Sequence, residues 1–335
     1  MASAATAASP APAVIAVIVN YCTAKLTVDC LRSLEPLVAE RTSTRVVVAD
    51  NASPDGSGKA IAEAIESNGW GEWAELMPLQ KNGGFAFGNN AVIRASANAP
   101  PAYYWLVNSD TIVRPGALQH LVDFAESHPR VGIVGSCLEH LDGTQQVSTF
   151  RFPTILGEIE ANAPVGQLGR RLLAGNVIAE PPSKTLRACD WLAGASMLIR
   201  RQALEEAGLM DEEFFLYYEE TDFCRRCKTH GWECWFVPES RVVHLIGAST
   251  GVTGKRPGPP KRRPQYWFAS RRRYFVKNHG RLYAIASEIA LATATTVKRA
   301  AEIVRRRPTE IPEKFVFDLI RNSALFNWRE RPPAE

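Results

Sequence analysis

Three short apolar runs decide the fold of this chain: Val14-Ile-Ala-Val-Ile-Val-Asn20, Arg45-Val-Val-Val-Ala-Asp50 and Tyr103-Tyr-Trp-Leu-Val107. Uninterrupted runs rich in β-branched residues are typical of strands that are buried on both faces of a sheet. Stretches with helical character separate them, among them Ala24–Arg41 and Ser57–Glu66. Strands and helices that alternate at this spacing predict an α/β fold with a mostly parallel central sheet flanked by helices.

The chain of 335 residues is long enough to bury one large core and a smaller attached lobe. An Ala-, Ser- and Pro-rich stretch predicts a disordered tail over residues 1–13. The alternation of strands and helices continues over 14–265, and a helical extension is expected over 266–335. Residues 153–183 are irregular, with Pro, Gly and Asn, and predict a long functional loop or a helical insertion.

Composition and charge exclude several classes of protein. Apolar residues make up 46% of the chain, which is ordinary for a globular protein and argues against disorder or a polytopic membrane fold. The seven cysteines are scattered and odd in number, so a cytoplasmic location is expected. Eight basic residues and no acidic one lie between Lys255 and Arg273, which predicts a local anion site. The rest of the chain is near neutral and has no nucleic-acid motif, so no nucleic-acid partner is expected.

Polar residues stand where the first two predicted strands end, as Asn20-Tyr21 and Asp50-Asn51. Ligands of parallel α/β sheets bind at these carboxyl ends, where a carboxylate accepts hydrogen bonds from a base N–H or a ribose hydroxyl. An equally good interpretation is structural: Asp50 begins an Asx turn and Ser53 caps the next helix. The two interpretations are compatible.

A glycine- and asparagine-rich segment, Lys81-Asn-Gly-Gly-Phe-Ala-Phe-Gly-Asn-Asn90, leads into a predicted helix. Glycines allow a close approach of the backbone, and amides at a helix N-terminus suit a diphosphate or a ribose. The spacing is neither that of the dinucleotide-binding fingerprint nor that of a P-loop. The segment alone is therefore a weak indication of a nucleotide site.

The third strand delivers a carboxylate at its tip, in Leu106-Val-Asn-Ser-Asp110. Mg²⁺ and Mn²⁺ take oxygen ligands, commonly one or two protein carboxylates, with phosphates and water completing the shell. Asp110 is thus a candidate ligand of a cation that bridges two phosphates, with an Asx-type turn as the alternative. His244 follows a β-branched run, where a histidine is more often structural than a ligand.

Acidic residues are most concentrated between Glu212 and Asp222, among aromatic residues and ahead of a predicted helix. Like charges beside apolar walls raise carboxyl pKa values toward those of a general base, which makes Glu219, Glu220 and Asp222 candidates for that role. Acids at the positive end of a helix dipole are the structural alternative. That alternative accounts for two acids more readily than for the whole group.

Two further segments each admit two interpretations. Cys224-x-x-Cys227, with His230 and Cys234, has a spacing compressed for zinc and falls on a predicted helix, which favours packing. Leu282–Arg307 is an apolar stretch followed by basic residues, as expected of a helix on an anionic membrane surface. Packing of that helix on its own core, or on a second subunit in a homodimer, is the equal alternative.

Six motifs, taken together and in order, resemble family 2 glycosyltransferases of the GT-A fold, and most closely their rhamnosyltransferase-like branch. The resemblance covers Val14 to Gly280. It implies a GT-A catalytic domain over 14–265, with a nucleotide-binding half over about 14–115 and an acceptor half over about 116–265. The motifs are Asn20-Tyr21, Asp50-Asn-Ala-Ser53, Asn82-x-Gly-Phe-Ala-x-Gly-Asn-Asn90, Asn108-Ser-Asp110, Trp191-Leu-x-Gly194-Ala195 and Phe215-Leu-Tyr-x-Glu219-Glu220-x-Asp222.

The resemblance also implies a role for each motif. Glu220 stands at the position of the catalytic base, with Glu219 as the fallback and Asp222 beside them. Asp110 and His244 would hold Mg²⁺ or Mn²⁺, with Asn108 in place of the first acid of the family's Asp-x-Asp. Trp191, Gly194 and Ala195 would face the acceptor. The nucleotide sugar would lie against Asn20, Tyr21, Asp50, Asn51, Lys81, Asn82, Gly83, Gly84, Asn89, Asn108, Ser109, Arg272 and Arg273.

The implied reaction is an inverting transfer of a sugar from a nucleoside diphosphate to a hydroxyl of a glycan or a polyprenyl-linked glycan in surface polysaccharide synthesis. The resemblance favours dTDP-L-rhamnose as the donor, with a UDP-hexose or UDP-galactofuranose as the alternative. A nucleotidyltransferase would need a glycine-rich triphosphate loop after the first strand, and Tyr21–Leu26 offers none. A nucleotide-sugar-binding protein without turnover would not need the acids of Glu219–Asp222.

Overall fold

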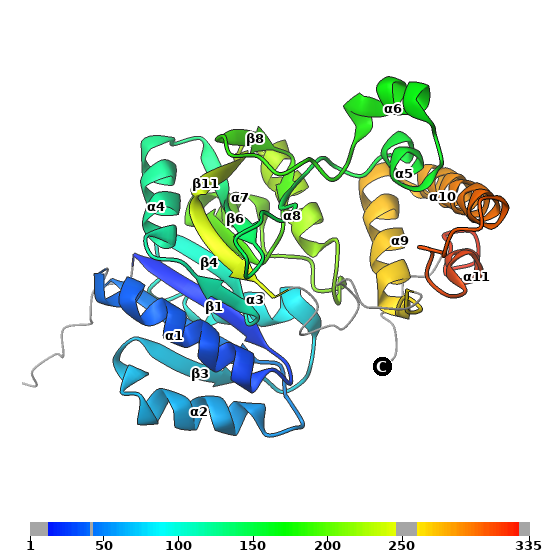
Figure 1. The fold of residues 1–335 in the computed structure, drawn as a ribbon. Helices are drawn as coiled ribbons and strands as arrows, with labels where there is room; N and C mark the ends of the chain where they lie inside the picture. Colours follow the sequence, from blue (N-terminus) through cyan, green and yellow to red (C-terminus); the bar gives the residue numbers. More distant parts are fainter. Residues whose placement is uncertain (1–12, 41–42, 246–259, 328–335) are drawn as a thin grey trace, which may run out of the picture.

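The computed structural model describes residues 13–40, 43–245 and 260–327. Its centre is a nine-stranded sheet in the order β3-β2-β1-β4-β10-β6-β11-β5, with β8 paired to β11, while β7 and β9 form a separate two-stranded sheet (Figure 1). The strands are β1 (Val14–Asn20), β2 (Thr44–Asp50), β3 (Ala74–Pro78), β4 (Tyr103–Asn108), β5 (Thr111–Val113), β6 (Val131–Glu139), β7 (Thr149–Phe150), β8 (Arg187–Cys189), β9 (Trp191–Leu192), β10 (Ser196–Arg200) and β11 (Glu233–His244).

Helices cover both faces of the large sheet and form an additional group beside it (Figure 1). They are α1 (Ala24–Glu40), α2 (Ser57–Ser67), α3 (Gly84–Ala95), α4 (Ala117–Ser127), α5 (Ile155–Asn162), α6 (Gln167–Leu173), α7 (Arg201–Ala207), α8 (Glu219–Thr229), α9 (Gln265–His279), α10 (Arg281–Val304) and α11 (Phe315–Arg321). Two short 3-10 helices, η1 (Trp70–Glu72) and η2 (Ala174–Asn176), complete the described elements.

The direction of the strands confirms the predicted mostly parallel sheet. β3, β2, β1 and β4 pair in parallel, and β10 runs against both β4 and β6. Because β6 therefore runs with β4, and β11 runs parallel to β6, six strands share one direction. The carboxyl ends of β1, β2 and β4 thus lie at one edge of the sheet, with Asn20 directly opposite Asp50. The polar motifs after these strands meet there.

The uninterrupted apolar runs arise because each strand is buried on both sides. Val14, Ala16 and Ile18 of β1 belong to a core formed with residues of α1, α2 and α4. Ile15 and Val17, which point the other way, belong to a second core formed with residues of α3, α7 and α8. Successive side chains of a strand point to opposite faces, so a strand between two helical layers is apolar at every position.

The insertion at residues 153–183 is helical and joins the C-terminal extension. Its helix α5 packs against α10, and Figure 1 shows α5, α6, α9, α10 and α11 grouped beside the sheet domain; these five helices are called the helical lobe below. A buried ion pair joins the parts: the Arg271 guanidinium donates to Glu158 Oε1 from Nε at 2.9 Å, and Ser287 Oγ donates to Glu158 Oε2 at 2.7 Å. Replacing one partner would leave a buried charge unpaired, so we infer that this contact fixes α5 on α9 and α10.

Some predicted elements differ from those observed. The sequence predicts one strand over Trp191–Arg200, where the structure has two, β9 and β10. It also predicts a strand over Cys234–Pro238, and the observed strand β11 continues to His244. That extension matters for the site, because it carries His244 beside β5. Residues 1–12 and most of the basic segment from Lys255 to Arg263 lie outside the described residues. Among the helices that the structure describes, none is both long and apolar enough to cross a membrane.

Candidate active site

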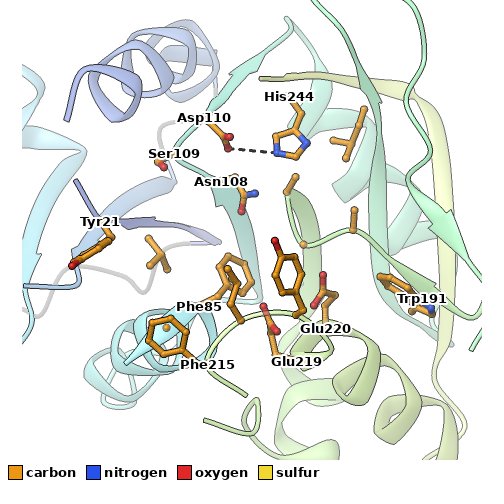
Figure 2. Close-up of a pocket in the computed structure, with 18 of the residues that line it drawn as sticks. Tyr21, Phe85, Asn108, Ser109, Asp110, Trp191, Phe215, Glu219, Glu220 and His244 are labelled. Carbon is orange, nitrogen blue, oxygen red and sulfur yellow. Dashed lines mark ion pairs between the residues drawn. The ribbon is translucent and has the colours of Figure 1, made fainter. Parts of the chain in front are cut away.

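A pocket of about 440 Å³ opens at the carboxyl ends of β1 and β4. Loops after β1, β4 and β9, the start of α3 and the start of α8 supply its walls. Figure 2 shows Asp110 and His244 at one side of the cavity, with Glu219 and Glu220 across from them. In the same view Tyr21 lies at one end and Trp191 at the other. The pocket therefore has two facing polar groups and two distinct ends.

Most of the predicted site residues meet in this pocket, although their motifs are far apart in the sequence. Val19, Phe85, Gln146, Phe150, Phe215 and Tyr217 lie among them, and none of these six is among the predicted site residues. The predicted residues that line the pocket are Tyr21, Asn51, Asn82, Gly84, Asn108, Ser109, Asp110, Trp191, Gly194, Ala195, Glu219, Glu220 and His244.

The remaining predicted residues lie outside the walls of the pocket: Asn20, Asp50, Lys81, Gly83, Asn89, Asp222, Arg272 and Arg273. For Asn20 and Asp50 the hydrogen bonds explain this position. Asn20 is fully buried and donates from Nδ2 to Asp50 Oδ1 at 2.6 Å. The Ser53 amide and hydroxyl also donate to the Asp50 carboxylate, so the Asx turn weighed as an alternative is present. The neighbouring residues Tyr21 and Asn51 line the pocket in their place.

Asp222 does not join the acids in the pocket. It is fully buried on α8, and its Oδ2 accepts from Arg226 Nε at 3.0 Å and from Lys277 Nζ at 2.8 Å. Asn278 donates to its other oxygen at 3.1 Å. Its partners, two cations and an amide, make this carboxylate a structural link between α8 and α9. The sequence placed Asp222 among the catalytic acids, and the structure places it outside the pocket.

The arginines of α9 bind protein groups, whereas the sequence predicted a local anion site here and contacts of Arg272 and Arg273 to the nucleotide sugar. Arg271 pairs with Glu158 as described, and Arg272 Nη1 donates to the Asn322 carbonyl at 2.5 Å. Arg273 Nη2 bonds Asp211 Oδ2 at 2.9 Å. The three arginines are adjacent in the sequence but contact three different partners, because consecutive helical residues do not point in the same direction.

Asp110 and His244 come together through strand pairing. β11 runs antiparallel to β5 with His244 opposite Thr111, the residue after Asp110. The Leu245 amide donates to the Asp110 carbonyl at 2.9 Å, which closes the ladder. As a result His244 Nε2 lies 3.5 Å from Asp110 Oδ1, the contact drawn in Figure 2. The Asp110 side chain is only 4% exposed, and its Oδ1 has no hydrogen-bond partner among the described residues.

These two side chains fit a divalent cation. An unsatisfied buried carboxylate oxygen is costly unless a ligand binds it. Two ligand atoms on one ion with bonds of about 2.1 Å lie no more than about 4.2 Å apart, and the observed 3.5 Å satisfies this limit. Within the described ranges no cluster of three or more His, Cys, Asp or Glu side chains suits a metal. Most coordination positions would therefore fall to substrate oxygens and water, as is usual for Mg²⁺.

The carboxylates across the pocket have strongly perturbed acidities. Burial raises the pKa of Glu220 to about 7, an effect that the backbone amides of Glu220 and Gly194 partly offset. Burial and the neighbouring Glu220 raise the pKa of Glu219 well above its usual value. Of the two carboxyl groups, Glu219 has the more strongly raised pKa, while the pKa of Glu220 lies near neutral pH. A carboxyl with a pKa near the working pH is suited to general base catalysis.

The chain that carries this pair is held in a strained conformation. Tyr217 and Tyr218 have φ angles of 72° and 70°, a region that residues other than glycine rarely occupy. Aromatic packing holds it: Tyr218 lies 5.3 Å from Tyr274 and Tyr217 lies 6.2 Å from Tyr266, measured between ring centroids. Both partners belong to α9. Strain of this kind persists where the surroundings over-determine it, often beside an active site.

Gly84 lets the start of α3 approach the segment that leads from Phe215 to Glu219. The Phe85 amide donates to the Phe215 carbonyl at 3.0 Å, and a Cβ at Gly84 would lie 1.8 Å from that carbonyl oxygen. Gly84 also has a φ of 85°. Both facts require glycine here, since any side chain would push the start of α3 away from the loop that leads to Glu219. The glycine-rich segment thus has a packing role that its sequence alone does not reveal.

An aromatic pair forms the end of the pocket near Trp191. Trp191 and Phe150 stack with ring centroids 4.1 Å apart and an interplanar angle of 14°. The two residues are paired across the small β7–β9 sheet. Trp191 Nε1 donates to the Arg151 carbonyl at 3.0 Å, which fixes the orientation of the ring. This end is therefore a rigid, largely apolar wall.

Gln146 is a functional candidate that sequence reasoning missed. Its Nε2 donates to the His244 carbonyl at 2.7 Å and to the Glu139 carbonyl at 3.0 Å. It therefore holds the end of β11, and with it His244, from the neighbouring loop. No motif signals this role, because the contact joins residues that only the folded sheet brings together. Phe215 and Tyr217 belong to the same motif as Glu219 and Glu220, and the structure places both aromatic side chains in the lining of the pocket.

Comparison with known proteins identifies the family. A match to the family described as glycosyltransferase like family 2 spans residues 2–280, which is most of the chain. The chain belongs to this family. It is a glycosyltransferase, and the expectation drawn from the six motifs is confirmed.

Relatives with assigned activities include rhamnosyltransferases. N-acetylglucosaminyl-diphospho-decaprenol L-rhamnosyltransferase of Mycobacterium tuberculosis is 28% identical over 224 residues, which cover 64% of this chain and 70% of that protein. Rhamnosyltransferase WbbL of Escherichia coli K12 is 25% identical over 167 residues, covering 48% and 60%. dTDP-rhamnosyl transferase RfbF of Shigella flexneri is 36% identical over 50 residues, 15% of this chain and 17% of that protein.

Solved structures confirm the GT-A fold. The mannosyltransferase PcManGT of Pyrobaculum calidifontis, in complex with GDP-Man and Mn²⁺, aligns over 96% of this chain and 81% of its own with a TM-score of 0.55 and 17% identity. GalNAc-T7 with UDP, GalNAc and Mn²⁺ aligns over 89% of this chain and 59% of its own with a TM-score of 0.57 and 14% identity. At this identity the likeness concerns the fold.

Proposed function

We propose that this glycosyltransferase transfers L-rhamnose from dTDP-L-rhamnose to a hydroxyl of a lipid-linked glycan, with inversion at the anomeric carbon and with the help of a divalent cation. The observation that carries the proposal is the arrangement of one pocket. The Asp110–His244 pair, suited to a cation and a diphosphate, faces the Glu219–Glu220 pair, suited to deprotonating an acceptor. In one pocket the two pairs would act on the donor and on the acceptor of a single transfer.

Glu220 is the proposed general base. The acceptor oxygen attacks the anomeric carbon, the bond from that carbon to the diphosphate breaks, and the hydroxyl proton passes to the Glu220 carboxylate. A single displacement of this kind converts a β-L-rhamnosyl donor into an α-L-rhamnoside. Positioned proton transfer contributes typically about 10²–10⁴-fold to rate. Glu219, beside the base, would orient the acceptor hydroxyl by a hydrogen bond.

Asp110 and His244 would hold Mg²⁺ or Mn²⁺, with Asn108 as a neutral neighbour. Such a cation stabilises negative charge on a departing diphosphate. Two solved structures of similar fold contain Mn²⁺ together with a nucleotide, which supports the proposal of a divalent cation. On the protein side, no hydrogen bond from the described residues reaches Asp110 Oδ1, which leaves that atom available for the ion.

The donor end is assigned to the side of Tyr21, Asn51 and Asn82, and the acceptor end to the side of Trp191. Asn51 is fixed by a hydrogen bond from its Nδ2 to the Gly84 carbonyl at 2.9 Å, so its position is set before a nucleotide binds. The stacked Trp191–Phe150 wall offers a flat apolar surface of the kind on which a sugar ring packs. Roles for Asn20, Asp50, Lys81, Gly83 and Asn89 would then be to shape this end from behind the pocket wall.

The sugar and the acceptor are proposed from the relatives. Three of them carry rhamnosyltransferase names, one of these names specifies a dTDP donor, and one specifies a diphospho-decaprenol acceptor. A UDP-hexose donor remains the second candidate, because the low-salt glycan biosynthesis hexosyltransferase Agl10 of Haloferax volcanii is 36% identical over 70 residues, 21% of this chain. A lipid-linked acceptor would place the reaction at a membrane surface.

Thermal shifts with a panel of nucleoside diphosphates test the donor assignment. dTDP, UDP and GDP are added with Mn²⁺ or with a chelator, and the melting temperature is recorded. A ligand at a hundred times its dissociation constant stabilises the folded state by about 2.7 kcal/mol. We expect the largest shift with dTDP and only when Mn²⁺ is present. A larger shift with UDP would move the proposal to the hexose donor, and no shift with any diphosphate would contradict a nucleotide-sugar site.

A further inference from the structure

Helix α10 has two apolar faces. One is buried in the helical lobe and includes Ala284, Leu291 and Ala294. The other is exposed and carries Leu282, Ile289, Val297, Ile303 and Val304, each between 50% and 85% exposed. Leu282, Ile289, Val297 and Val304 follow one another at spacings of seven or eight residues, which places them on one side of the helix, with Ile303 at the edge of that side. The positions between them on that side are alanine and threonine, so the exposed face is uncharged along the helix.

A helix face that meets water ordinarily carries charged residues. The acids of α10 do not serve this purpose, since Glu288 and Glu302 are both buried. Glu288 accepts hydrogen bonds from the Ala324 amide at 3.0 Å, within the lobe. Burial of both acids leaves Arg281, Lys298 and Arg299 as the charged residues at or near the surface of the helix, and all of them are basic.

Further arginines follow directly. Arg305, Arg306 and Arg307 are exposed at the end of α10. Lys298 pairs with Glu310 at 2.8 Å and Arg299 with Glu302 at 3.6 Å, which partly neutralises these two residues. The exposed surface of α10 therefore combines an apolar strip with a basic end, and no exposed acid lies on the helix itself. Juxtamembrane basic residues attract anionic lipid with about 1 kcal/mol each.

Neighbouring helices of the lobe extend the same character. On α6, Leu168 and Leu172 are 73% and 75% exposed and lie beside Arg170 and Arg171. On α11, which packs on α10, Phe317 is 60% exposed. Twelve of the sixteen large exposed apolar residues in the described part of the chain come from the lobe helices α5, α6, α10 and α11 and from the turn after α11. Concentrated exposure of this kind marks an interaction surface.

We propose that the exposed face of α10 lies on the surface of an anionic lipid bilayer, parallel to the membrane plane, with Arg305–Arg307 at the lipid phosphates. An amphipathic helix of this composition inserts its apolar side chains into the headgroup region while its basic residues contact anionic lipid. A second copy of the chain fits less well, because two such faces would bring together basic residues with no exposed acid on either helix to compensate. The inference rests on α10 alone and does not depend on the sugar that is transferred.

Vesicle co-sedimentation of the full chain tests the inference. Vesicles of equal parts phosphatidylcholine and phosphatidylglycerol are compared with vesicles of phosphatidylcholine alone, at low and high salt. We expect binding to the anionic vesicles that falls as salt rises, and weaker binding to the neutral ones. Replacing Arg305, Arg306 and Arg307 with Gln should lower the partition coefficient about a hundredfold. Equal binding to both vesicle types, or none to either, would overturn the inference.

A pair of matched variants separates the α10 face from general hydrophobicity. The double substitution Ile289→Glu and Val297→Glu places charge on the proposed membrane face, and we expect loss of vesicle binding. Leu141→Glu changes a residue that is 70% exposed in a turn of the sheet domain, and binding should be unchanged. Both variants should keep the dTDP-dependent thermal shift, which shows that they fold and that the donor site is independent. Vesicle binding that survives the double substitution, or a dimer in solution that only this substitution dissociates, would contradict a membrane role for α10.

Discussion

Replacing Glu220 with Gln should have two opposite effects, a loss of turnover and a gain in stability. Gln cannot accept a proton, so we expect turnover to fall by about two orders of magnitude or more while the dissociation constant for the donor changes little. The wild-type turnover should depend on pH with the same group. With a pKa of about 7, the ionised fraction of Glu220 rises from about a tenth at about pH 6 to about nine-tenths at about pH 8. Turnover should rise in parallel.

The stability effect follows from the same pKa. Burial raises the pKa of Glu220 from 4.5 to about 7, so the folded protein holds this proton more tightly than the unfolded chain does. Its contribution to stability is fully present below about pH 4.5 and is lost as pH rises through about 7. That difference in pKa corresponds to at most about 3 kcal/mol. Glu220→Gln should therefore melt at a higher temperature than the wild type above pH 7, with a gain that shrinks toward pH 5.

Glu219→Gln is the matched control, because it makes the same amide replacement at the adjacent carboxyl group and leaves the proposed base in place. We expect a milder loss of turnover and an unchanged pH dependence. The assays are steady-state transfer and thermal denaturation, each from pH 5 to 8.5. Turnover of Glu220→Gln within tenfold of the wild type, or a destabilised Glu220→Gln above pH 7, would refute the assignment of a buried, titrating base. A dead Glu219→Gln beside an active Glu220→Gln would move the base by one residue.

Three further substitutions probe the rest of the site. Asp110→Ala should abolish the Mn²⁺-dependent thermal shift with dTDP while leaving the fold intact, and a variant that keeps the shift would make Asp110 a turn residue only. His244→Ala should weaken Mn²⁺ affinity about 10–100-fold in a titration, without changing the affinity for the metal-free nucleoside. Gly84→Ala should lower the melting temperature more than Gly56→Ala, because both have positive φ but only the first places its Cβ against the Phe215 carbonyl; equal losses would show that φ alone matters.

Much of the fold could be predicted from sequence, because its cause is local. A strand buried on two faces must be apolar throughout, so Val14–Asn20 and Thr44–Asp50 were recognisable without any tertiary information. Their parallel pairing then places the polar residues after them at one edge. For the same reason the sequence pointed to Tyr21, Asn51 and Asp110 as neighbours, and all three line the pocket.

The errors concern side chains whose partners are distant in the chain. Asp222 looked like a member of an acidic cluster, but Lys277 of α9 neutralises it. The sequence suggested Arg273 as a phosphate ligand, but its guanidinium forms an ion pair with Asp211. Neither pairing is visible from spacing, since it depends on how α9 docks against α8. The sequence raised His244 as a candidate ligand without showing its neighbour, because its approach to Asp110 depends on the β5–β11 pairing.

The helical lobe was the least predictable region. The sequence predicts either a long functional loop or a helical insertion over residues 153–183, and the structure shows helices there, with α5 joined to α9 by the Glu158–Arg271 pair. The stretch Leu282–Arg307 admitted either a membrane contact or packing. The structure shows packing on one face of α10 and a second, exposed apolar face on the other. A hydrophobic pattern records that a face is apolar, and only tertiary structure tells which faces are already covered.

The most direct test of the proposed function is to follow one acceptor through the reaction. The full chain is incubated with dTDP-L-rhamnose, Mn²⁺ and a polyprenyl-diphospho-N-acetylglucosamine, and the lipid fraction is analysed by mass spectrometry and by NMR of the anomeric carbon. We predict an acceptor heavier by one deoxyhexose, in α-linkage, formed by the wild type and not by Glu220→Gln or with a chelator. A product that carries a hexose when a UDP-sugar replaces the donor, a β-linked product, or transfer that is indifferent to Glu220 would contradict it.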